Sequence, residues 1–426
     1  MRWLGYAIRF WVMGTLLSWY ALCYGVGRFG ALFIRDAEHR RRAVARLRGR
    51  TLRVGMARLG ATFVKLGQIL STRPDLLEPE TIDELRQLQD RLPPFELARV
   101  RAILEAELGG PLEERFLAFD TVPVAAASVA QVHRARLADG TEVAVKVLRP
   151  DVRRKVERDA AILLLFARVL HLSPRARLSD PVGHLRHFVA GILEQTDLRL
   201  EVENYRRFAA HFATAEGVRF PRVYGELSGE RMMTMEFLRG TKVDALPPGD
   251  HRALALRLQR VFLKMCFEDG FVHADLHPGN LLVTSSGDIA IFDVGLVKHL
   301  SEDVFLQFVD FTKCIVMGTP HDFVRHMQRF HSYATDVDWL AFERDVGDLV
   351  TRFRALDIAK LEMGQLMNDL FGLGRRYRVR PMAEMMLVLV AMVTAEGIGK
   401  QLYPGNNLFH DTAAFLAPRL AGLGLA

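Results

Sequence analysis

Cysteine is scarce in this chain of 426 residues, and the three that occur, Cys23, Cys266 and Cys314, stand far apart. Neither a disulfide framework nor the ligand spacing of a zinc site is indicated by this distribution. The sequence also lacks internal repeats and low-complexity linkers, which excludes a repeat architecture. A chain of this length can bury sizeable cores in more than one lobe.

Lysine is missing from the first 53 residues, although these contain eleven arginines and only two acidic residues. Their net charge of +9 exceeds the +7 of the whole chain, so the remaining residues together carry −2. A nearly neutral body argues against a nucleic-acid surface, because nucleic-acid phosphates are bound by clustered Lys and Arg side chains. We therefore predict that nucleic acid is not a partner.

Charge is absent from residues 11–27, a run rich in Trp, Tyr, Leu and Val that is followed by nine arginines between Arg28 and Arg53. This run is at the lower limit for a membrane span, and residues 10–34 are long enough if Arg28 reaches the interface. Three interpretations stay open: a helix in the membrane interface or packed on the body, a membrane anchor, and a cleaved signal. Arginines after a spanning segment keep the body cytoplasmic, so the expected location is the cytoplasmic face of a membrane, peripheral or anchored.

Two short phrases carry the strongest chemical signal. Residues 273–280 read His-Ala-Asp-Leu-His-Pro-Gly-Asn, and residues 291–295 read Ile-Phe-Asp-Val-Gly. Phosphoryl transfer needs one carboxylate near the attacking hydroxyl, and it needs a carboxylate and an amide to hold Mg²⁺ on the phosphates. We predict Asp275, Asn280 and Asp293 as catalytic residues, with Asn280 and Asp293 as the metal ligands.

A lysine strand precedes these phrases, as a kinase-type site requires. Residues 143–147 read Val-Ala-Val-Lys-Val, and this alternation predicts a strand with Ala144 and Lys146 on one face. The Asp-Gly pair at 139–140 predicts a hairpin turn, which makes residues 129–137 the partner strand. Lys146 is accordingly predicted to bind nucleotide and to take part in catalysis.

Residues 185–212 are predicted to form one helix. Asp197, Glu201 and Asn204 follow one another at i, i+4 and i+7 and therefore share one helix face. A charged stripe on a helix is more often a solvated surface, but the lysine strand and the two catalytic phrases favour a functional interpretation. We predict Glu201 as the ion-pair partner of Lys146.

Glycine is missing where a protein kinase has its glycine-rich loop, since residues 123–128 read Pro-Val-Ala-Ala-Ala-Ser. Alanine carries a Cβ and resists positive φ, so this loop is stiffer and cannot approach phosphate as closely. We also predict a hinge at 235–237, with its backbone facing adenine. The residues predicted to contact the nucleotide are Ala125, Ala126, Ala127, Ser128, Ala144, Lys146, Glu201, Glu236 and Phe237.

From roughly Arg53 to Leu408 the chain resembles the UbiB/AarF-type atypical kinase family. Two marks carry the resemblance beyond the shared kinase residues: Lys-Leu-Gly-Gln at 65–68, and Ala-Ala-Ala-Ser-Val-Ala-Gln-Val-His at 125–133. In that family the first motif lies over the active site where a protein substrate would lie, which implies ATP hydrolysis or a small or lipidic acceptor. The resemblance implies regulatory roles for Lys65, Gly67, Gln68 and Asp197.

One position departs from the family pattern. Gln195 stands where the family has a glutamate that holds the lysine of the first motif, here Lys65. Glu194 is the neighbouring acid, but it lies about 100° round a helix from position 195. Either Glu194 substitutes for the missing acid, or Gln195 hydrogen bonds to Lys65 without neutralising it.

The resemblance implies an α+β, bilobal protein-kinase-like fold with an N-terminal helical extension. The predicted segments are an apolar membrane-associating stretch at 1–35, the helical extension with the Lys-x-Gly-Gln motif at 36–110, a small lobe at 111–237 and a large lobe at 238–426. The implied cofactors are ATP or ADP and Mg²⁺. The implied partners are nucleotide, a lipid or quinone-precursor acceptor, a membrane surface and lipid-biosynthesis proteins.

The implied function is that of an ATP-dependent phosphotransferase or ATPase that supports quinone (ubiquinone) or isoprenoid-lipid metabolism at a membrane. Two alternatives remain. A nucleotide-binding pseudokinase scaffold is disfavoured by the intact Asp275, Asn280 and Asp293. A soluble small-molecule kinase is disfavoured by the motif at 65–68, because kinases of that type lack it.

Overall fold

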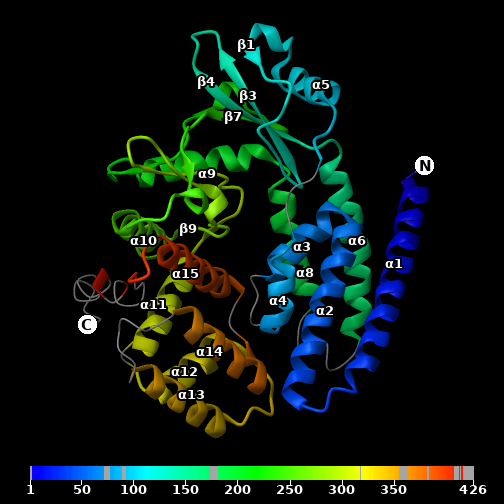
Figure 1. Cartoon of the computed structure of the whole chain (residues 1–426), viewed down its shortest axis with the longest axis vertical. Helices are drawn as coiled ribbons and strands as arrows, with labels where there is room; N and C mark the ends of the chain where they lie inside the picture. Colours follow the sequence, from blue (N-terminus) through cyan, green and yellow to red (C-terminus); the bar gives the residue numbers. More distant parts are fainter. Residues whose placement is uncertain are drawn as a thin grey trace. The chain divides into compact units, whose positions relative to one another are not determined.

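The computed structural model describes residues 2–71, 77–88, 93–172, 181–316, 318–354, 363–380, 383–406, 412, 414 and 415. The chain divides into two compact units, labelled along the ribbon in Figure 1. Unit 1 comprises residues 1–203 and 222–237, and unit 2 comprises residues 204–221 and 238–426. Both units combine helices with mostly antiparallel strands, which is the predicted α+β class.

Unit 1 contains a sheet that has six strands among the described residues. The strand order is β1-β3-β4-β7-β6, with β2 paired to β3, and every pairing is antiparallel. The strands are β1 (Phe116–Phe119), β2 (Ala125–Ala126), β3 (Ala130–Leu137), β4 (Glu142–Leu148), β6 (Val223–Tyr224) and β7 (Met232–Glu236). The predicted hairpin is confirmed: Gly140 adopts a φ of +86° in the turn, and the Asp139 carboxylate accepts a hydrogen bond from the Thr141 amide.

The alternation along β4 sorts its side chains between the two faces of the sheet. Val143, Val145 and Val147 are fully buried in a core that includes residues of helix α5 (Leu97–Leu108). The intervening Ala144 and Lys146 point to the opposite face, because successive side chains of a strand alternate. The strand predicted at 143–147 and its two faces are confirmed.

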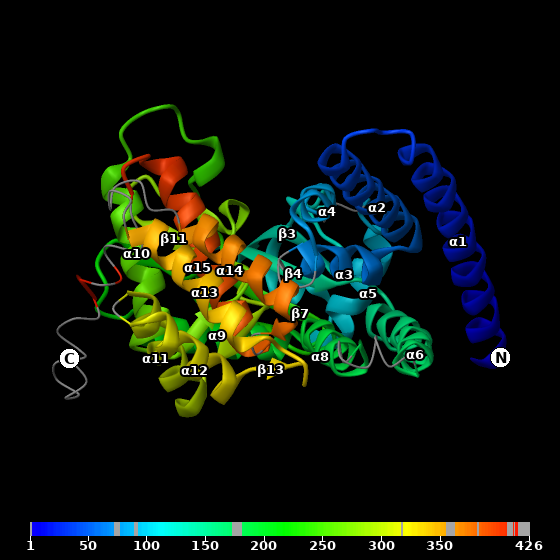
Figure 2. The ribbon, with the colours of Figure 1, turned by 90° about the horizontal axis from the view of Figure 1, so that it is seen from below.

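The remaining helices of unit 1 form a layer around a second apolar core. They are α1 (Arg2–Ala31), α2 (Ala37–Leu59), α3 (Ala61–Ser71), α4 (Pro79–Leu85), α6 (Val152–His171), α8 (Pro181–Glu194) and the first part of α9 (Leu198–His211). The buried members of this core are Met13, Met56, Leu59, Phe63, Val64, Leu85, Leu88 and Ile162. Figure 2 shows α1 running along the α2 and α6 side of this layer.

Helix α1 is attached to unit 1 by polar contacts as well. The guanidinium of Arg9 donates to both carboxylate oxygens of Asp159 over 2.7 Å and to the Leu59 carbonyl over 2.6 Å. Phe10 stacks on Phe166 of α6 at a ring-centroid distance of 5.9 Å. One face of the predicted apolar segment is therefore packed on the body.

The single helix predicted at 185–212 is wrong, because the chain breaks it into α8 and α9. The Thr196 hydroxyl donates to the Leu193 carbonyl over 2.7 Å, and the Asp197 carboxylate accepts from the Arg199 amide over 3.1 Å. Such side-chain hydrogen bonds to the backbone end one helix and cap the next. Asp197 thus precedes α9 and does not share a helix face with Glu201, whereas Asn204 remains on the same helix as Glu201.

The strands of unit 2 are short. One sheet has the order β5-β11-β10-β8, and two further pairs are β9 with β12 and β13 with β14. These strands are β5 (Val218–Arg219), β8 (Thr241–Lys242), β9 (Phe271–His273), β10 (Leu281–Val283), β11 (Ile289–Ile291), β12 (Val297–His299), β13 (Ser332–Tyr333) and β14 (Val379–Arg380). The β9 to β11 stretch carries both catalytic phrases.

Helices make up most of unit 2. They are the second part of α9, α10 (Arg252–Phe267), α11 (Glu302–Val316), α12 (Pro320–Phe330), α13 (Trp339–Arg354), α14 (Met363–Tyr377) and α15 (Ala383–Leu402). One large apolar core contains side chains from each of the helices α10, α11, α12, α13, α14 and α15. Helix α15 supplies Met385, Val388, Leu389 and Met392 to this core. Helix α15 carries apolar side chains on several sides because it is surrounded by other helices.

Candidate active site

The structure brings Lys146 and Glu201 together within unit 1. The ammonium of Lys146, on β4, donates to both carboxylate oxygens of Glu201, on α9, over 2.8 and 2.9 Å. The two side chains are only 15% and 5% exposed. Each charge would be costly to bury alone, so the two groups stabilise one another's ionised form.

The alanine-rich loop is a tight hairpin on β3. The Val124 amide donates to the Val132 carbonyl, and the Ala127 amide donates to the Ala130 carbonyl, both over 2.8 Å. The Arg149 guanidinium donates to the Ala127 carbonyl over 2.8 Å from outside the hairpin. These bonds hold the loop in place through its backbone, and the stiffness that its alanine content predicts stays a prediction. Contact of Ala125, Ala126 and Ser128 with a nucleotide stays a prediction.

A buried polar chain behind this loop is not evident from the sequence. The Phe95 amide donates to Gln131 Oε1 over 3.0 Å, and Gln131 Nε2 lies 2.8 Å from His133 Nε2. An amide nitrogen can only donate, so His133 Nε2 is the acceptor and its proton resides on Nδ1, which donates to the Asp120 carbonyl over 2.8 Å. Burial lowers the pKa of His133, which keeps the ring neutral.

The first catalytic phrase folds as a turn between β9 and β10. Asn280 is buried, and its Nδ2 donates to the Asp275 carbonyl over 3.1 Å. This orientation leaves the Asn280 Oδ1 available as a metal ligand. The Asp275 amide donates to Nδ1 of His273 over 3.2 Å. Burial lowers the pKa of His273, so its imidazole is neutral and can accept this bond. His273 and Asn280 thus fix the backbone of Asp275 through these two hydrogen bonds.

Asp293 lies after β11 with a φ of +60°, in the left-handed region that a residue with a Cβ seldom adopts. Its amide donates to the Tyr205 hydroxyl over 2.8 Å, and the neighbouring Val294 carbonyl accepts from Asn204 Nδ2 over 2.9 Å. Asn204 and Tyr205 therefore hold the turn of Asp293, the predicted metal ligand. Sequence reasoning missed both roles, although Asn204 and Tyr205 follow Glu201 by one helical turn.

The predicted hinge ends β7. The Phe237 amide donates to the Glu142 carbonyl over 3.2 Å, and the Glu236 amide donates to the Arg222 carbonyl over 2.8 Å. Both amides are thus engaged with neighbouring backbone in this structure. A role for the hinge in binding adenine stays a prediction.

The Lys-x-Gly-Gln motif lies on α3, where two of its residues have a packing role. A Cβ on Gly67 would lie 2.2 Å from Leu88 Cδ1 and 2.8 Å from Met56 Sδ, so a larger residue would force these two side chains to move. The Gln68 side-chain amide donates to the Leu88 carbonyl over 3.4 Å. Regulation by Lys65, Gly67 and Gln68 stays a prediction.

Gln195, the departure from the family pattern, lies in the break between α8 and α9. Its Nε2 is buried and has no hydrogen-bond partner among the residues that the structure describes. The following Asp197 pairs with Arg199 over 2.7 Å, and this guanidinium holds the pKa of Asp197 below its usual value. A contact of Gln195 or Glu194 with Lys65 stays a prediction.

The side chains of unit 2 fit Mg²⁺ by their chemistry. Magnesium takes oxygen ligands and is bound in phosphoryl-transfer enzymes through one or two protein groups plus phosphates. Asn280 presents its Oδ1 because its amide nitrogen is used by Asp275, and Asp293 offers a carboxylate on a turn that Tyr205 holds. Asn280 and Asp293 are therefore the residues that would hold the ion.

Together, the five-stranded path with its lysine, the paired glutamate helix and the two catalytic phrases define a protein-kinase-like molecule. The ABC1 atypical kinase-like domain matches residues 87–325, and the UbiB helical domain matches residues 346–407. The chain belongs to the ABC1/UbiB family of atypical kinases.

Curated relatives and a solved structure agree with this membership. The protein named "Probable protein kinase UbiB" of Pseudomonas fluorescens is 33% identical over 386 residues, which cover 87% of this chain and 71% of the relative. The protein of the same name from Vibrio vulnificus is 32% identical, covering 86% of this chain and 70% of the relative. The complex of Rv3197 with erythromycin, from Mycobacterium tuberculosis, is 21% identical with a TM-score of 0.56, covering 83% of this chain and 92% of that one, and it shares the fold.

Proposed function

We propose that this protein is a Mg²⁺- and ATP-dependent atypical kinase or ATPase that supports quinone (ubiquinone) or isoprenoid-lipid metabolism at the cytoplasmic face of a membrane. The observation that carries the proposal is the buried Lys146–Glu201 pair, at 2.8 Å. A buried ion pair adds little stability over an apolar replacement, so a positioning role is the better explanation for it. In kinases this pair holds the lysine on the α- and β-phosphates.

The residues of the two catalytic phrases have complementary roles in this proposal. Asp275 accepts the proton of the attacking hydroxyl or water, and its backbone is held by Asn280 and His273. Asn280 Oδ1 and the Asp293 carboxylate hold the cation. When bound, Mg²⁺ neutralises the charge that develops on the transferred phosphoryl group. The name of the curated relatives, probable protein kinase, supports an enzyme over a scaffold.

The outer face of α1 supports membrane association. Residues Ala7–Ala31 are long and apolar enough to cross a membrane, yet Arg9 ties the helix to Asp159 of α6. Large apolar side chains are exposed along it. They are Ile8, Trp11, Val12, Leu17, Trp19, Leu22, Val26 and Phe29. We propose that α1 lies in the membrane interface with this face in the lipid, which places a lipid or quinone-precursor acceptor within reach of the enzyme.

The arginines of α2 contribute less to this surface than their number indicates. Arg48 pairs with Glu78, and Arg53 pairs with Glu84 of α4 over 3.1 Å. These two side chains hold α2 on α4 within unit 1. Apolar contact by α1 is therefore proposed as the main source of membrane affinity.

The experiment is ATP hydrolysis by the purified protein with and without lipid vesicles and candidate quinone precursors. Asp293→Asn should lower Mg²⁺-dependent turnover on the order of 100-fold or more, because an amide cannot neutralise the ion. The matched control is Asp288→Asn in the β10–β11 turn, whose carboxylate accepts from Ser286, a contact within the turn itself. Hydrolysis by Asp293→Asn at the wild-type rate would contradict the assignment.

Labelled γ-phosphate separates the two reaction types. Label recovered in the extracted lipid or quinone fraction would indicate phosphotransfer, and label recovered only as inorganic phosphate would indicate an ATPase. If neither product forms in wild type under any of these conditions while nucleotide still binds, the protein is a nucleotide-binding scaffold.

A further inference from the structure

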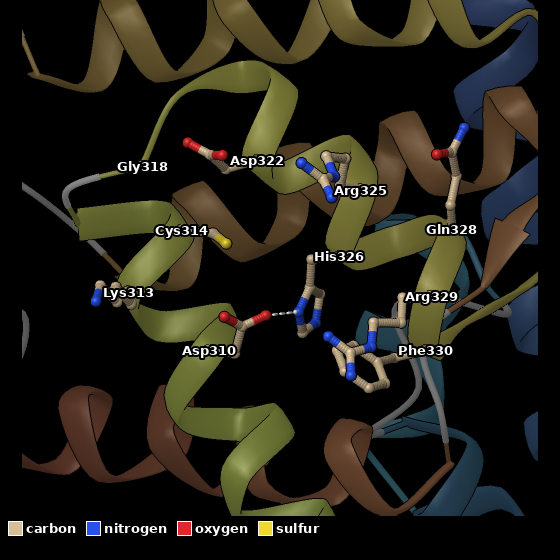
Figure 3. A pocket seen from close by; sticks show the side chains of 10 residues that line it. All are labelled: Asp310, Lys313, Cys314, Gly318, Asp322, Arg325, His326, Gln328, Arg329 and Phe330. Atoms are coloured by element: carbon tan, nitrogen blue, oxygen red, sulfur yellow. Dashed lines mark hydrogen bonds and ion pairs between the residues drawn. The ribbon is translucent and has the colours of Figure 1, made fainter. Parts of the chain in front are cut away.

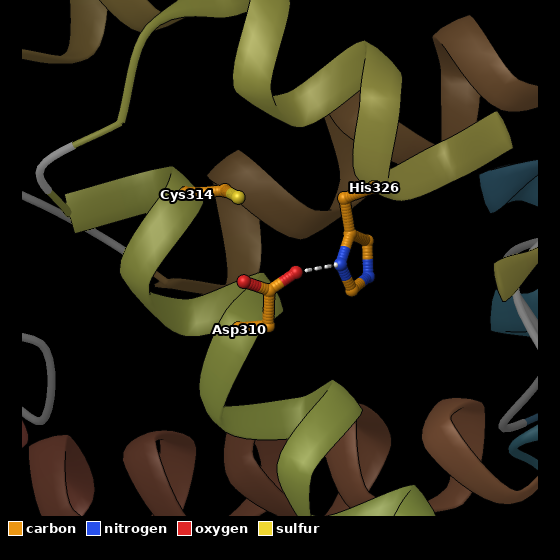
Figure 4. Close-up of side chains that lie close together, drawn as sticks. All are labelled: Asp310, Cys314 and His326. Carbon is orange, nitrogen blue, oxygen red and sulfur yellow. Dashed lines mark hydrogen bonds and ion pairs between the residues drawn. The ribbon is translucent and has the colours of Figure 1, made fainter. Parts of the chain in front are cut away.

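A second cluster of reactive side chains lies between α11 and α12 of unit 2. Asp310 and Cys314 are four residues apart on α11 and share one helix face, and His326 comes from α12. One ligand atom from each of the three lies within 4.8 Å of the other two (Figure 4). The cysteine spacing indicated no such site, because two of these donors are not cysteines and one comes from another helix.

The histidine of this cluster is buried in the protein interior. The His326 side chain is 1% exposed, and its Nδ1 lies 2.7 Å from Asp310 Oδ2. Its Nε2 is buried without a hydrogen-bond partner among the described residues. A neutral imidazole in this position offers one nitrogen lone pair to a cation.

The two helices hold these side chains in a fixed frame. A capping box begins α12: Thr319 accepts from the Asp322 amide, and the Asp322 carboxylate accepts from the Thr319 amide. The His326 ring packs against Phe311 and Phe330, at centroid distances of 5.6 and 5.0 Å. These aromatic contacts restrict the rotation of the ring while its Nδ1 bonds to Asp310.

We propose that Asp310, Cys314 and His326 bind a divalent metal ion of the zinc class. Carboxylate oxygen, imidazole nitrogen and thiolate sulfur are the three donor types that zinc takes in proteins, whereas Mg²⁺ avoids sulfur and nitrogen. The one N–H proton of the neutral His326 ring moves from Nδ1 to Nε2, so that the ion takes the place of this proton between Nδ1 and Asp310 Oδ2. The proton of the Cys314 thiol passes to solvent. With zinc–ligand bonds of about 2.0 to 2.3 Å, the ligand atoms must approach one another by roughly 1 Å.

Three protein ligands leave one position of a tetrahedral ion open. A pocket of about 700 Å³ lies beside the cluster and is lined by all three ligands (Figure 3). Lys313, Arg325 and Arg329 also line it. These cations favour water or a small anion as the fourth ligand, since a second cation would be repelled.

The test uses the purified full-length chain, stripped of metal with a chelator and titrated with Zn²⁺ against a chromophoric competitor, and separately with Co²⁺. We expect one Zn²⁺ per chain and a thiolate-to-cobalt charge-transfer band. Asp310→Asn, Cys314→Ser and His326→Gln should each weaken Zn²⁺ binding by about 10- to 100-fold or more, since even the loss of an outer-shell partner has that effect. Cys314→Ser should also abolish the cobalt band.

Two matched controls distinguish this site from adventitious binding. His321→Gln removes an exposed histidine of the same helix, and Cys23→Ser removes an exposed thiol; both should bind as wild type. Circular dichroism checks that each variant is folded. Asp310 is the most exposed of the three ligands, so Asp310→Asn should disturb the fold least. Unchanged Zn²⁺ affinity in Asp310→Asn and Cys314→Ser, or a cobalt band that persists in Cys314→Ser, overturns the proposal.

Discussion

At the scale of single residues, Tyr205 and Asp293 are coupled through one hydrogen bond. Tyr205→Phe removes the hydroxyl that accepts from the Asp293 amide over 2.8 Å, at a residue whose φ is +60°. The unpaired amide should lower the free energy of unfolding by roughly 1 kcal/mol. The turn should also relax, so ATP turnover should fall more than nucleotide binding.

Denaturant unfolding and steady-state kinetics measure these two effects. Tyr333→Phe is the matched control, because Tyr333 is an exposed tyrosine of unit 2 whose described contact is ring packing on Trp339. Wild-type turnover and stability in Tyr205→Phe would show that the hydroxyl does not hold the aspartate.

His133 gives the molecule a pH dependence of stability. In the unfolded chain its pKa takes the ordinary value of about 6.5, whereas burial lowers it in the folded chain. Below about pH 6.5 the unfolded state therefore binds more protons than the folded state, and the free energy of unfolding falls as the pH falls. His133→Gln lacks this titration.

We expect the melting temperature of the wild type to fall more between about pH 7.5 and pH 5.5 than that of His133→Gln. His273, His326 and His331 also have lowered pKa values and titrate in both proteins, so the difference between the two slopes isolates His133. Parallel pH profiles would mean that folding does not lower the pKa of His133.

At the scale of elements, α9 supplies functional side chains to both units. Its first part carries Glu201 to the lysine of β4 in unit 1, and its second part carries Asn204 and Tyr205 to the Asp293 turn in unit 2. The break at 195–197 sets where this helix begins. A change in this break therefore affects residues of both units.

The ion pair between β4 and α9 can be tested directly. Lys146→Ala leaves the Glu201 carboxylate buried without its partner, at a cost on the order of 3 kcal/mol. The variant should also lose the rise in melting temperature that Mg²⁺-ATP produces in the wild type. Lys155→Ala, at an exposed lysine of α6, is the control. A normal rise in Lys146→Ala would contradict a role of the pair in nucleotide binding.

Local signals in the sequence predict the elements that hold the site, but long-range pairs escape them. The alternation at 143–147 and the Asp-Gly turn at 139–140 determine β4 and its hairpin through neighbouring residues alone. By contrast, Arg9 and Asp159 are 150 positions apart and meet only through packing of α1 on α6. The same applies to Tyr205 and Asp293, because no local pattern marks a tyrosine as the partner of a distant amide.

At the scale of the whole molecule, the two faces of α1 have different roles. The outer face is apolar and exposed, and the inner face packs in the core of unit 1. Met13 is fully buried, and Asp159 is almost fully buried beneath Arg9. Removing residues 1–35 would take Met13 out of this core and leave the Asp159 carboxylate without Arg9, so the deletion changes stability as well as membrane affinity. Substitutions on the outer face separate the two effects, because they leave the Arg9–Asp159 pair intact.

Trp11 and Trp19 are 71% and 57% exposed on that outer face. Trp11→Gln combined with Trp19→Gln should weaken co-sedimentation with anionic lipid vesicles at least about tenfold, since inserting each large apolar side chain contributes roughly 1.5 to 3 kcal/mol. Leu340→Gln, at a still more exposed apolar side chain of unit 2, should bind as wild type. The melting temperature without lipid should be the same in all three proteins, because neither surface is part of a core. If the double variant sediments with vesicles as well as the wild type does, the outer face of α1 is not the membrane-binding surface.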